Sequence, residues 1–391
     1  MKKHIKGMFI TMGAYVSANV GAAFASGNEL LQFFGSWGGT DTVISVVAGF
    51  ITTVIYTACL YYIGQGEKFE TSVDAYAFFG GKILGRFFQI FSAILSAATV
   101  MLLFSGAGSL FWQEFGVPVW VGAVLLGVVS VAIVIGGLSR VQNVLGYAGI
   151  IILIYILIFG VITLFNPESS MSQVAGVTEM VDEGIIWQAN LFTLFPFSLF
   201  PKLAELNSPV LDGVLYGTLC IVPGFLFYLS LGERSKKAGE AVGSAVLSTA
   251  AYFVCIALVL VLVMMNFDAV LNPETGEMYP FPAVAVIRSF WPSGSWTYVV
   301  ILFVAIFTTY TAILWSLNRV IFEKNENSKK SHVFVVALTI FGICFGSVLP
   351  FSEFVNILQP VSGVVGLLMM ATIVVKTLQI CRKKHKALPN C

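Results

Sequence analysis

Hydrophobic stretches of 18 or more residues recur along the whole chain, and each is long enough to cross about 30 Å of hydrocarbon as an α-helix. Glycine and proline punctuate these stretches, and the alternating ten-residue pattern of an outer-membrane barrel does not appear. Only 10% of the 391 residues are charged, against about 25% in soluble domains. The pattern therefore predicts an all-α membrane protein.

We expect about ten transmembrane helices in a single transporter domain. The expected spans are residues 7–35, 40–63, 83–112, 119–137, 142–166, 209–232, 241–266, 296–321, 332–350 and 355–379. The charged start of the chain resembles a signal peptide, but the first stretch continues past Glu29 without a convincing cleavage site. We therefore expect it to be retained as the first span. The six cysteines have no metal-ligand spacing and suggest no disulfide framework.

One further apolar stretch, residues 184–201, is expected to stay on the outer face as a re-entrant lid or an interfacial helix. Lys and Arg near helix ends resist translocation. If this stretch does not cross, 19 of the 21 basic residues face the cytoplasm and only Lys202 and Arg288 lie outside. If it does cross, the basic clusters at 234–237, 319–330 and 376–386 all move outside. The charges thus predict a multi-pass cell-membrane protein with both termini cytoplasmic.

The ten spans divide into two halves of opposite orientation. Repeat one covers about 5–166, an external segment covers 167–207, repeat two covers about 208–380, and a tail covers 381–391. A long connection follows the second span of each half, at 64–82 and at 267–295, on opposite faces of the membrane. Such inverted repeats are typical of secondary transporters.

The first helix of each half contains an interruption, at Gly21–Gly27 and at Cys220–Gly224. One such run alone would favour an ordinary kink, since Gly and Pro are common in membrane helices. Two runs in corresponding positions favour two broken helices, which in transporters point to the substrate site.

The first interruption has the S-x-x-E form of a capping box, from Ser26 to Glu29. A helix start midway along a hydrophobic stretch leaves free N–H groups at bilayer depth, where they must line a cavity or be buried in protein. Those N–H groups could hold an anionic group such as a carboxylate. Glu29 has two interpretations: it completes the cap, or, as an ionisable residue within the membrane, it binds a cationic group or a proton.

The run from Tyr15 to Leu31 (YVSANVGAAFASGNELL) resembles the opening of the YkvI-like membrane protein family. The segment Leu215–Arg234 and the motifs EMYP (277–280) and IFTT (306–309) are similar to further parts of that family. The chain departs from the family pattern at Ala23, Asn28 and Cys220, and the last departure leaves the substrate class open. The resemblance implies the amino acid–polyamine–organocation superfamily, the leucine-transporter fold and amino-acid-like substrates.

The resemblance also implies a sodium site between the first and eighth spans. The eighth span has the pattern A-x-x-[ST]-[ST], and positions i, i+3 and i+4 share one helix face. Freed carbonyls before the first break would supply the other oxygen ligands. The candidate ligands are Ser17, Val20, Ala305, Thr308 and Thr309. Alternatively, the threonines bond back to the preceding turn or to a neighbouring helix.

The expected solute site combines both breaks with the third span. Its candidate residues are Gly21, Ala22, Ala23, Phe24, Ala25, Ser26, Glu29, Thr99, Cys220 and Phe225. Ser96, Ser105 and Tyr228 are further candidates, although aromatic residues in apolar spans are more often packing residues. No cofactor is expected apart from sodium as a coupling ion.

These features predict a secondary transporter that moves an amino acid or a related amine or carboxylate by alternating access coupled to sodium. A proton-coupled or uncoupled permease and a non-transporting membrane sensor remain alternatives. An enzyme is disfavoured because the only histidines, His4, His332 and His385, fall at cytoplasmic ends. The expected partners are a small-molecule substrate and the lipid bilayer, with no nucleic acid; the sequence does not predict an oligomeric state.

Overall fold

The computed structural model describes residues 2–21, 24, 26–135, 138–165, 170, 173–191, 201–322, 325, 328–348 and 351–387. Helices make up nearly all of this part of the chain, and its only strand-like feature is an isolated bridge between Leu271 and Met278. The helices that correspond to the predicted spans are α1 (Lys2–Asn19) with α3 (Asn28–Phe33), α4 (Gly39–Gly66), α5 (Ser72–Phe115), α6 (Val119–Val134), α7 (Leu138–Leu164), α9 (Pro209–Leu219) with α10 (Ile221–Gly232), α11 (Ala238–Met264), α13 (Ser295–Phe322), α14 (Lys329–Gly346) and α15 (Phe351–Ala387). Shorter elements join them: η1 (Gly35–Trp37), α8 (Gln173–Asp182), η4 (Pro201–Leu206), η5 (Phe267–Val270) and α12 (Pro282–Phe290).

Length and hydropathy qualify most of these helices as membrane spans. Seven of the described helices are individually long and apolar enough to cross a bilayer, and α9 with α10 qualifies as a pair bent by 55°. The short apolar helix α6 and the pair formed by α1 and α3 occupy the two remaining span positions. Large apolar side chains such as Ile83, Val128 and Val333 are exposed on the outside of the bundle, as expected of surfaces that face lipid. The chain is a multi-pass membrane protein.

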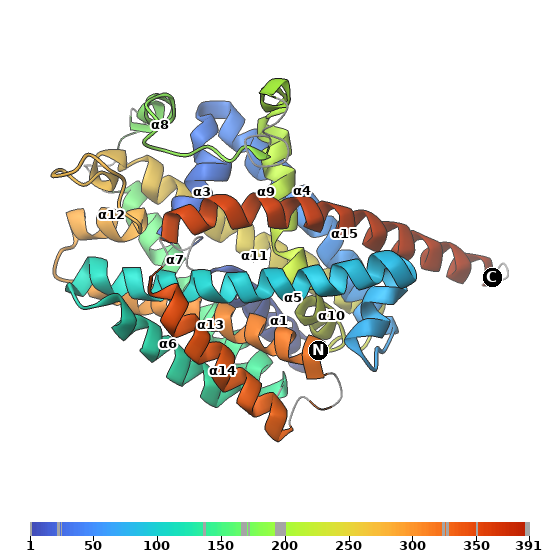
Figure 1. Ribbon diagram of the computed structural model, residues 1–391. Coiled ribbons are helices and arrows are strands. Elements are labelled where there is room, and N and C mark those ends of the chain that lie inside the picture. The colour runs from blue at the N-terminus through green and yellow to red at the C-terminus, as the bar shows by residue number, and fades with distance from the viewer. Residues whose placement is uncertain are drawn as a thin grey trace.

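Helix contacts repeat between the two halves of the chain. In the first half α1 packs against α7, α11 and α13, and in the second half α9 and α10 pack in the same way against α15, α4 and α5. The correspondence pairs α1/α3 with α9/α10, α4 with α11, α5 with α13, α6 with α14, and α7 with α15. Both N- and C-terminal ends lie toward the same end of the bundle, at the right of Figure 1. The predicted inverted repeat of five plus five helices with broken first and sixth helices is confirmed.

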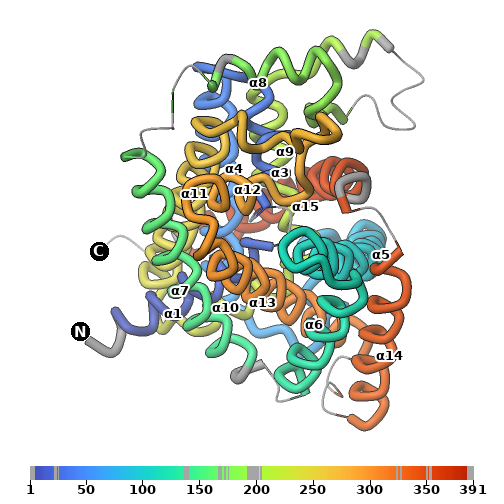
Figure 2. The backbone as a smooth tube through the Cα atoms, turned by 90° about the vertical axis from the view of Figure 1, so that its left-hand side faces the viewer, coloured from blue at the N-terminus to red at the C-terminus, as the bar shows by residue number. Residues whose placement is uncertain are grey.

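Two groups of helices surround the centre. The bundle group consists of α1/α3, α4, α9/α10 and α11, and the scaffold group consists of α5, α6, α13 and α14, whose members pack on one another. Figure 2 shows the bundle group on one side of the molecule and the scaffold group on the other, with α7 and α15 at the boundary. The breaks of α1/α3 and α9/α10 face the scaffold across this boundary.

Close glycine contacts hold the repeat-related helix pairs together. On α7, an added Cβ at Gly149 would lie 1.8 Å from the Gly13 carbonyl oxygen of α1. On α15, an added Cβ at Gly366 would lie 2.1 Å from the Thr218 carbonyl oxygen of α9. Each helix carries a second glycine three residues earlier, Gly146 and Gly363, that also faces the partner backbone. Small residues at this spacing allow membrane helices to approach closely.

Both long connections contain a helix that the sequence analysis did not predict. The connection at 64–82 includes the first turns of α5, which begin at a capping box formed by Thr71 and Asp74 and end at Gly81, where φ is 67°. The connection at 267–295 includes α12. In the external segment, α8 packs against η1, η5 and α11, while residues 192–200 lie outside the described residues. The placement of 184–201 on the outer face therefore stays a prediction.

Candidate functional site

The first helix is interrupted between α1 and α3. Regular helix ends at Asn19, after which the Gly21 N–H donates to the Asn19 carbonyl at 2.9 Å instead of to the preceding turn. The next helix, α3, begins at Asn28, behind Gly27, whose φ of 85° lies in the left-handed region that favours glycine. The predicted break is therefore present. The candidates Ala22, Ala23 and Ala25 lie outside the described residues.

The predicted capping box at this break is wrong. Gly27 is the N-cap of α3, and the Ser26 hydroxyl accepts the Asn28 N–H at 3.1 Å, one position earlier than a capping box requires. The Glu29 carboxylate does not turn back to the cap. It accepts a hydrogen bond from the Gln359 amide of α15 at 2.9 Å. The positive φ at Gly27 redirects the chain, so that Ser26 and Glu29 no longer share one helical turn.

The second break is a sharp bend between α9 and α10. Only Cys220 lies outside the two helices, so the predicted interruption from Cys220 to Gly224 is too long. Proline has no N–H, so Pro223 cannot bond to the carbonyl of Leu219 one turn earlier. The hydroxyl of Ser362 on α15 donates to that carbonyl instead. A helix of the same repeat thus satisfies the group that the bend leaves free.

A narrow cavity lies where the two breaks face the scaffold. The volume of this cavity that the centres of water molecules can reach is about 70 Å³, which is room for roughly five waters. Five predicted solute-site residues line it: Gly21 and Glu29 at the first break, Cys220 and Tyr228 at the second, and Thr99 on α5. The full lining is Ala18, Asn19, Gly21, Glu29, Thr99, Leu102, Leu103, Leu219, Cys220, Pro223, Gly224, Phe227, Tyr228, Thr309, Ala312, Ile313, Ser316, Leu358, Gln359 and Ser362.

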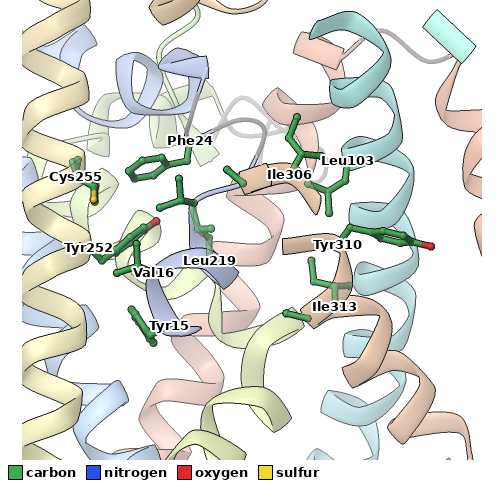
Figure 3. Close-up of a cluster of buried hydrophobic side chains, with 14 of the residues drawn as sticks. Tyr15, Val16, Phe24, Leu103, Leu219, Tyr252, Cys255, Ile306, Tyr310 and Ile313 are labelled. Carbon is green, nitrogen blue, oxygen red and sulfur yellow. The ribbon is translucent and has the colours of Figure 1, made fainter. Parts of the chain in front are cut away.

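Five described candidates do not line this cavity: Phe24, Ser26, Ser96, Ser105 and Phe225. Phe24 stacks on Tyr252 of α11 with ring centroids 5.3 Å apart, on the side of the apolar cluster away from Tyr310 (Figure 3). Phe225 contacts Tyr76 and Phe79 of α5, at centroid distances of 4.6 and 5.4 Å. Ser26 is fully buried beside Asn28. Phe24 and Phe225 are packing residues in this structure.

Several lining residues were missing from the expected solute site. Asn19 is one of them, and its side-chain oxygen accepts a 2.5 Å bond from the hydroxyl of the predicted Tyr228, which joins the two broken helices. Gln359 and Ser362 enter from α15, which the sequence analysis did not connect with the site. Polar residues within the last span were the available signal for both.

The candidate sodium ligands also come together. The Thr308 and Thr309 hydroxyls are donors to the Ser17 carbonyl oxygen at 2.8 and 3.1 Å, and the Thr308 hydroxyl is also within 2.9 Å of the Ala305 carbonyl oxygen. These bonds to a neighbouring helix and to the preceding turn are those that the alternative interpretation of the threonines predicts. Four neutral oxygens from α1 and α13 are thus neighbours beside the cavity. No structural contact of the fifth candidate, the Val20 carbonyl, is described, although Val20 directly follows α1. Oxygen donors of this type suit a hard cation such as sodium.

Comparisons with known proteins agree with this architecture. No protein-family model matches the chain. The uncharacterised membrane protein YkvI of Bacillus subtilis (strain 168) is 26% identical over 130 residues, which are 33% of this chain and 37% of that protein. The chain is therefore similar to YkvI over about a third of each protein, weak homology that agrees with the resemblance seen in the sequence.

Solved structures of transporters match over nearly the whole chain, each at 14% identity. MhsT in complex with L-phenylalanine has a TM-score of 0.62 and matches 93% of this chain and 87% of its own. A mutant of the Eremococcus coleocola manganese transporter has a TM-score of 0.55 and matches 95% and 78%. Mhp1, a nucleobase-cation-symport-1 family transporter with bromovinylhydantoin bound, has a TM-score of 0.53 and matches 90% and 74%. This likeness establishes the leucine-transporter-like fold.

Proposed function

We propose that this protein is a secondary active transporter that moves a small solute by alternating access. The observation that carries the proposal is the buried cavity at which both broken helices meet the scaffold. Both repeats contribute to its lining, so a rocking motion of the bundle group against the scaffold group would open it to one side or the other. The similar solved structures are themselves transporters, which supports the proposal at the level of the fold.

The solute we propose is an amino acid or a related amine or carboxylate. The cavity is small, and Glu29 is the only formally charged side chain among the described residues that line it. Unbonded peptide groups at a helix break can receive a carboxylate. The three similar structures are a phenylalanine complex, a hydantoin complex and a manganese transporter, so the fold alone does not choose between these solutes.

We further propose that sodium is co-transported through the site formed by Ser17, Ala305, Thr308 and Thr309. The site adjoins the cavity: Thr309 lines it, and an added Cβ at Gly21 would lie 3.4 Å from the Thr309 hydroxyl. A cation held here would fix the end of α1 against α13 next to the solute. Sodium binding would therefore favour a closed, solute-ready first break.

The orientation we propose places both termini in the cytoplasm. The distribution of basic residues in the sequence supports this placement. The two termini also lie at the same end of the bundle in Figure 1, as an even number of crossings requires.

Uptake into proteoliposomes tests the transport proposal. Purified protein should accumulate a labelled solute from an amino acid and amine panel, saturably and faster with an inward sodium gradient. A sensor or scaffold would show no uptake of any panel member above protein-free vesicles, which would contradict the proposal.

The double variant Thr308→Val with Thr309→Val tests the sodium site. Valine keeps the shape of threonine and removes both hydroxyls, each worth about 1.5–3 kcal/mol as a bond to a charged group. We expect the sodium concentration for half-maximal effect to rise at least about a hundredfold. The matched control is Thr311→Val on the same helix, because the Thr311 hydroxyl bonds back to Phe307 at 2.7 Å and does not line the cavity. An unchanged sodium response in the double variant would remove the ion site and leave transport standing.

A further inference from the structure

Glu29 is a buried carboxyl group that faces the cavity without a basic partner. Its exposed fraction is 4%, and its side-chain partners from other helices are neutral: the Gln359 amide of α15, which donates at 2.9 Å, and the Tyr216 hydroxyl of α9. The titratable groups around it are Tyr216 of α9, which is a hydrogen-bond partner, Cys220 at the second break, and Tyr252 of α11. On α15, the residue in contact with Glu29 is the uncharged Gln359. Among the described residues, no Lys, Arg or His lines the cavity with it.

An ionised carboxylate in such a place has too little compensation. Removing a charge from water into a low-dielectric interior is costly unless the charge is paired and fully hydrogen-bonded. One amide donor, the Tyr216 hydroxyl and the short N-terminal turn of α3 supply only part of that compensation, since none of them carries a positive charge. Two states avoid an unpaired buried charge at Glu29. In one the carboxyl group is protonated, and in the other a cation lies beside the carboxylate.

We propose that Glu29 selects a solute that carries an ammonium group, and that it releases its proton when this cation enters. The step breaks the O–H bond of the carboxyl group: Glu29–COOH and R–NH₃⁺ give Glu29–COO⁻ paired with ⁺H₃N–R, and the proton passes to water on the open side. When the solute leaves on the other side, Glu29 takes a proton from that side. One proton is therefore exchanged for one solute cation.

This inference rests on the proposed transport function and adds the substrate class and a second coupling ion to it. It does not replace the sodium site, whose oxygens come from different residues on α1 and α13. The two sites adjoin the same cavity but use different residues, so each can be altered without the other.

Infrared spectroscopy of the purified protein tests the proton directly and needs no knowledge of the solute. At neutral pH, in solute-free buffer, the wild-type protein should show the C=O stretch of a protonated carboxyl group that is missing from the Glu29→Gln variant. The control Glu179→Gln removes an exposed carboxyl group of α8 and should leave the band unchanged. A wild-type spectrum without a Glu29-dependent band would overturn the proton step.

Thermal stabilisation by a probe panel tests the selectivity. The panel is methylammonium, ethanolamine, putrescine, L-alanine and L-lysine, against ethylene glycol and propionate as neutral and anionic probes. At least one ammonium compound should stabilise the wild-type protein, with a half-saturating concentration about ten- to a hundredfold higher in Glu29→Gln. Glu29→Asp keeps the carboxyl group and should retain part of the effect.

The remaining outcomes of the panel are decisive as well. Stabilisation only by the neutral or anionic probe, or by no ammonium compound at all, overturns the selectivity. The same is true of an ammonium compound that stabilises the wild type and Glu29→Gln equally. Uptake of a solute without proton exchange would end this inference and leave the transporter proposal intact, whereas the infrared band and the stabilisation do not depend on transport.

Discussion

The bend at the second break should depend on Pro223, and replacing it with alanine should close the site. In the wild-type protein the Leu219 carbonyl receives no backbone N–H from Pro223 and is satisfied by the Ser362 hydroxyl. Pro223→Ala restores an N–H that can bond to Leu219, provided that α9 and α10 straighten from their 55° bend. Straightening would withdraw Cys220 and Leu219 from their positions in the cavity lining.

The size of the effect follows from two contributions. One backbone hydrogen bond has a net worth of about 0.5–1.5 kcal/mol. Removal of the clash between the proline ring and the preceding turn adds to it, since proline within a helix costs about 3 kcal/mol, and less near a helix start. We therefore expect the straight form to gain about 1–3 kcal/mol relative to the bent form. Because 1.4 kcal/mol is tenfold in an equilibrium constant, the bent population falls by about five- to 150-fold where the straight form dominates.

The assay is the apparent solute affinity of detergent-purified protein, together with its melting temperature. Apparent affinity weakens in proportion to the fraction of protein in the binding-competent form. Pro223→Ala should therefore raise the melting temperature and weaken solute affinity. The control is Pro209→Ala at the first position of α9, where no backbone N–H is required. A folded Pro223→Ala protein with wild-type affinity would refute the reasoning, because the bend would then not depend on the missing N–H.

Two further predictions concern packing and the cavity wall. Gly149→Ala would place a Cβ 1.8 Å from the Gly13 carbonyl oxygen, so α1 and α7 must separate by about an ångström. We expect thermal unfolding to show a loss of about 1–3 kcal/mol of stability. Gly176→Ala, with open space around it, should have no such effect. Tyr228→Phe removes the hydroxyl bonded to Asn19 and should weaken solute affinity by about two- to tenfold in equilibrium binding, whereas Tyr310→Phe, whose hydroxyl pairs with Thr339, should leave affinity unchanged.

The sequence predicted where the helices break because the signal is local. Gly21 and Gly27 interrupt an apolar stretch that is otherwise long enough to span the bilayer, and Pro223 interrupts the corresponding stretch of the second half. It could not predict how the chain turns within each break. The capping box failed because Gly27 adopts a positive φ, which the local pattern allows but does not require.

The cavity lining shows which local pattern was overlooked. On α10, Cys220, Pro223, Gly224, Phe227 and Tyr228 follow the i, i+3, i+4, i+7, i+8 spacing of one helix face. Once the break was placed at Cys220, this spacing already favoured Tyr228 over Phe225, which points away from the cavity.

The contribution of α15 was signalled only by polar residues within the last span, and no spacing pattern connected them with the site. Gln359 meets Glu29 across 330 residues of sequence, and this contact follows from the inverted repeat, which brings α15 beside α9 and α3. The convergence of Thr308 and Thr309 on α1 was easier to predict, because their i, i+3, i+4 spacing from Ala305 is itself local. The sequence alone does not indicate the direction from which each partner helix approaches.

The two breaks are held by α15 in different ways, and under the proposed alternating access this difference predicts the order of opening. On α9, hydroxyls join the two backbones: Thr218 donates to the Gly363 carbonyl at 2.7 Å, and Ser362 donates to the Leu219 carbonyl. Separating α9 from α15 would leave the Leu219 carbonyl, already without its helical donor, unsatisfied in the interior, at a cost of about 1–3 kcal/mol.

On α3, the hydrogen bonds to α15 among the described residues run between side chains. Gln32 donates to Asn356 at 2.7 Å and Gln359 donates to Glu29 at 2.9 Å, and both contacts are only partly buried. Water can replace such bonds at a net cost of about 0.5–1.5 kcal/mol each. Two such bonds together cost about 1–3 kcal/mol, the same range as the Leu219 carbonyl, but the α9 contact also has the Thr218 bond and the close backbone approach at Gly366. Under the proposed alternating access we therefore expect α3 to separate from α15 before α9 does.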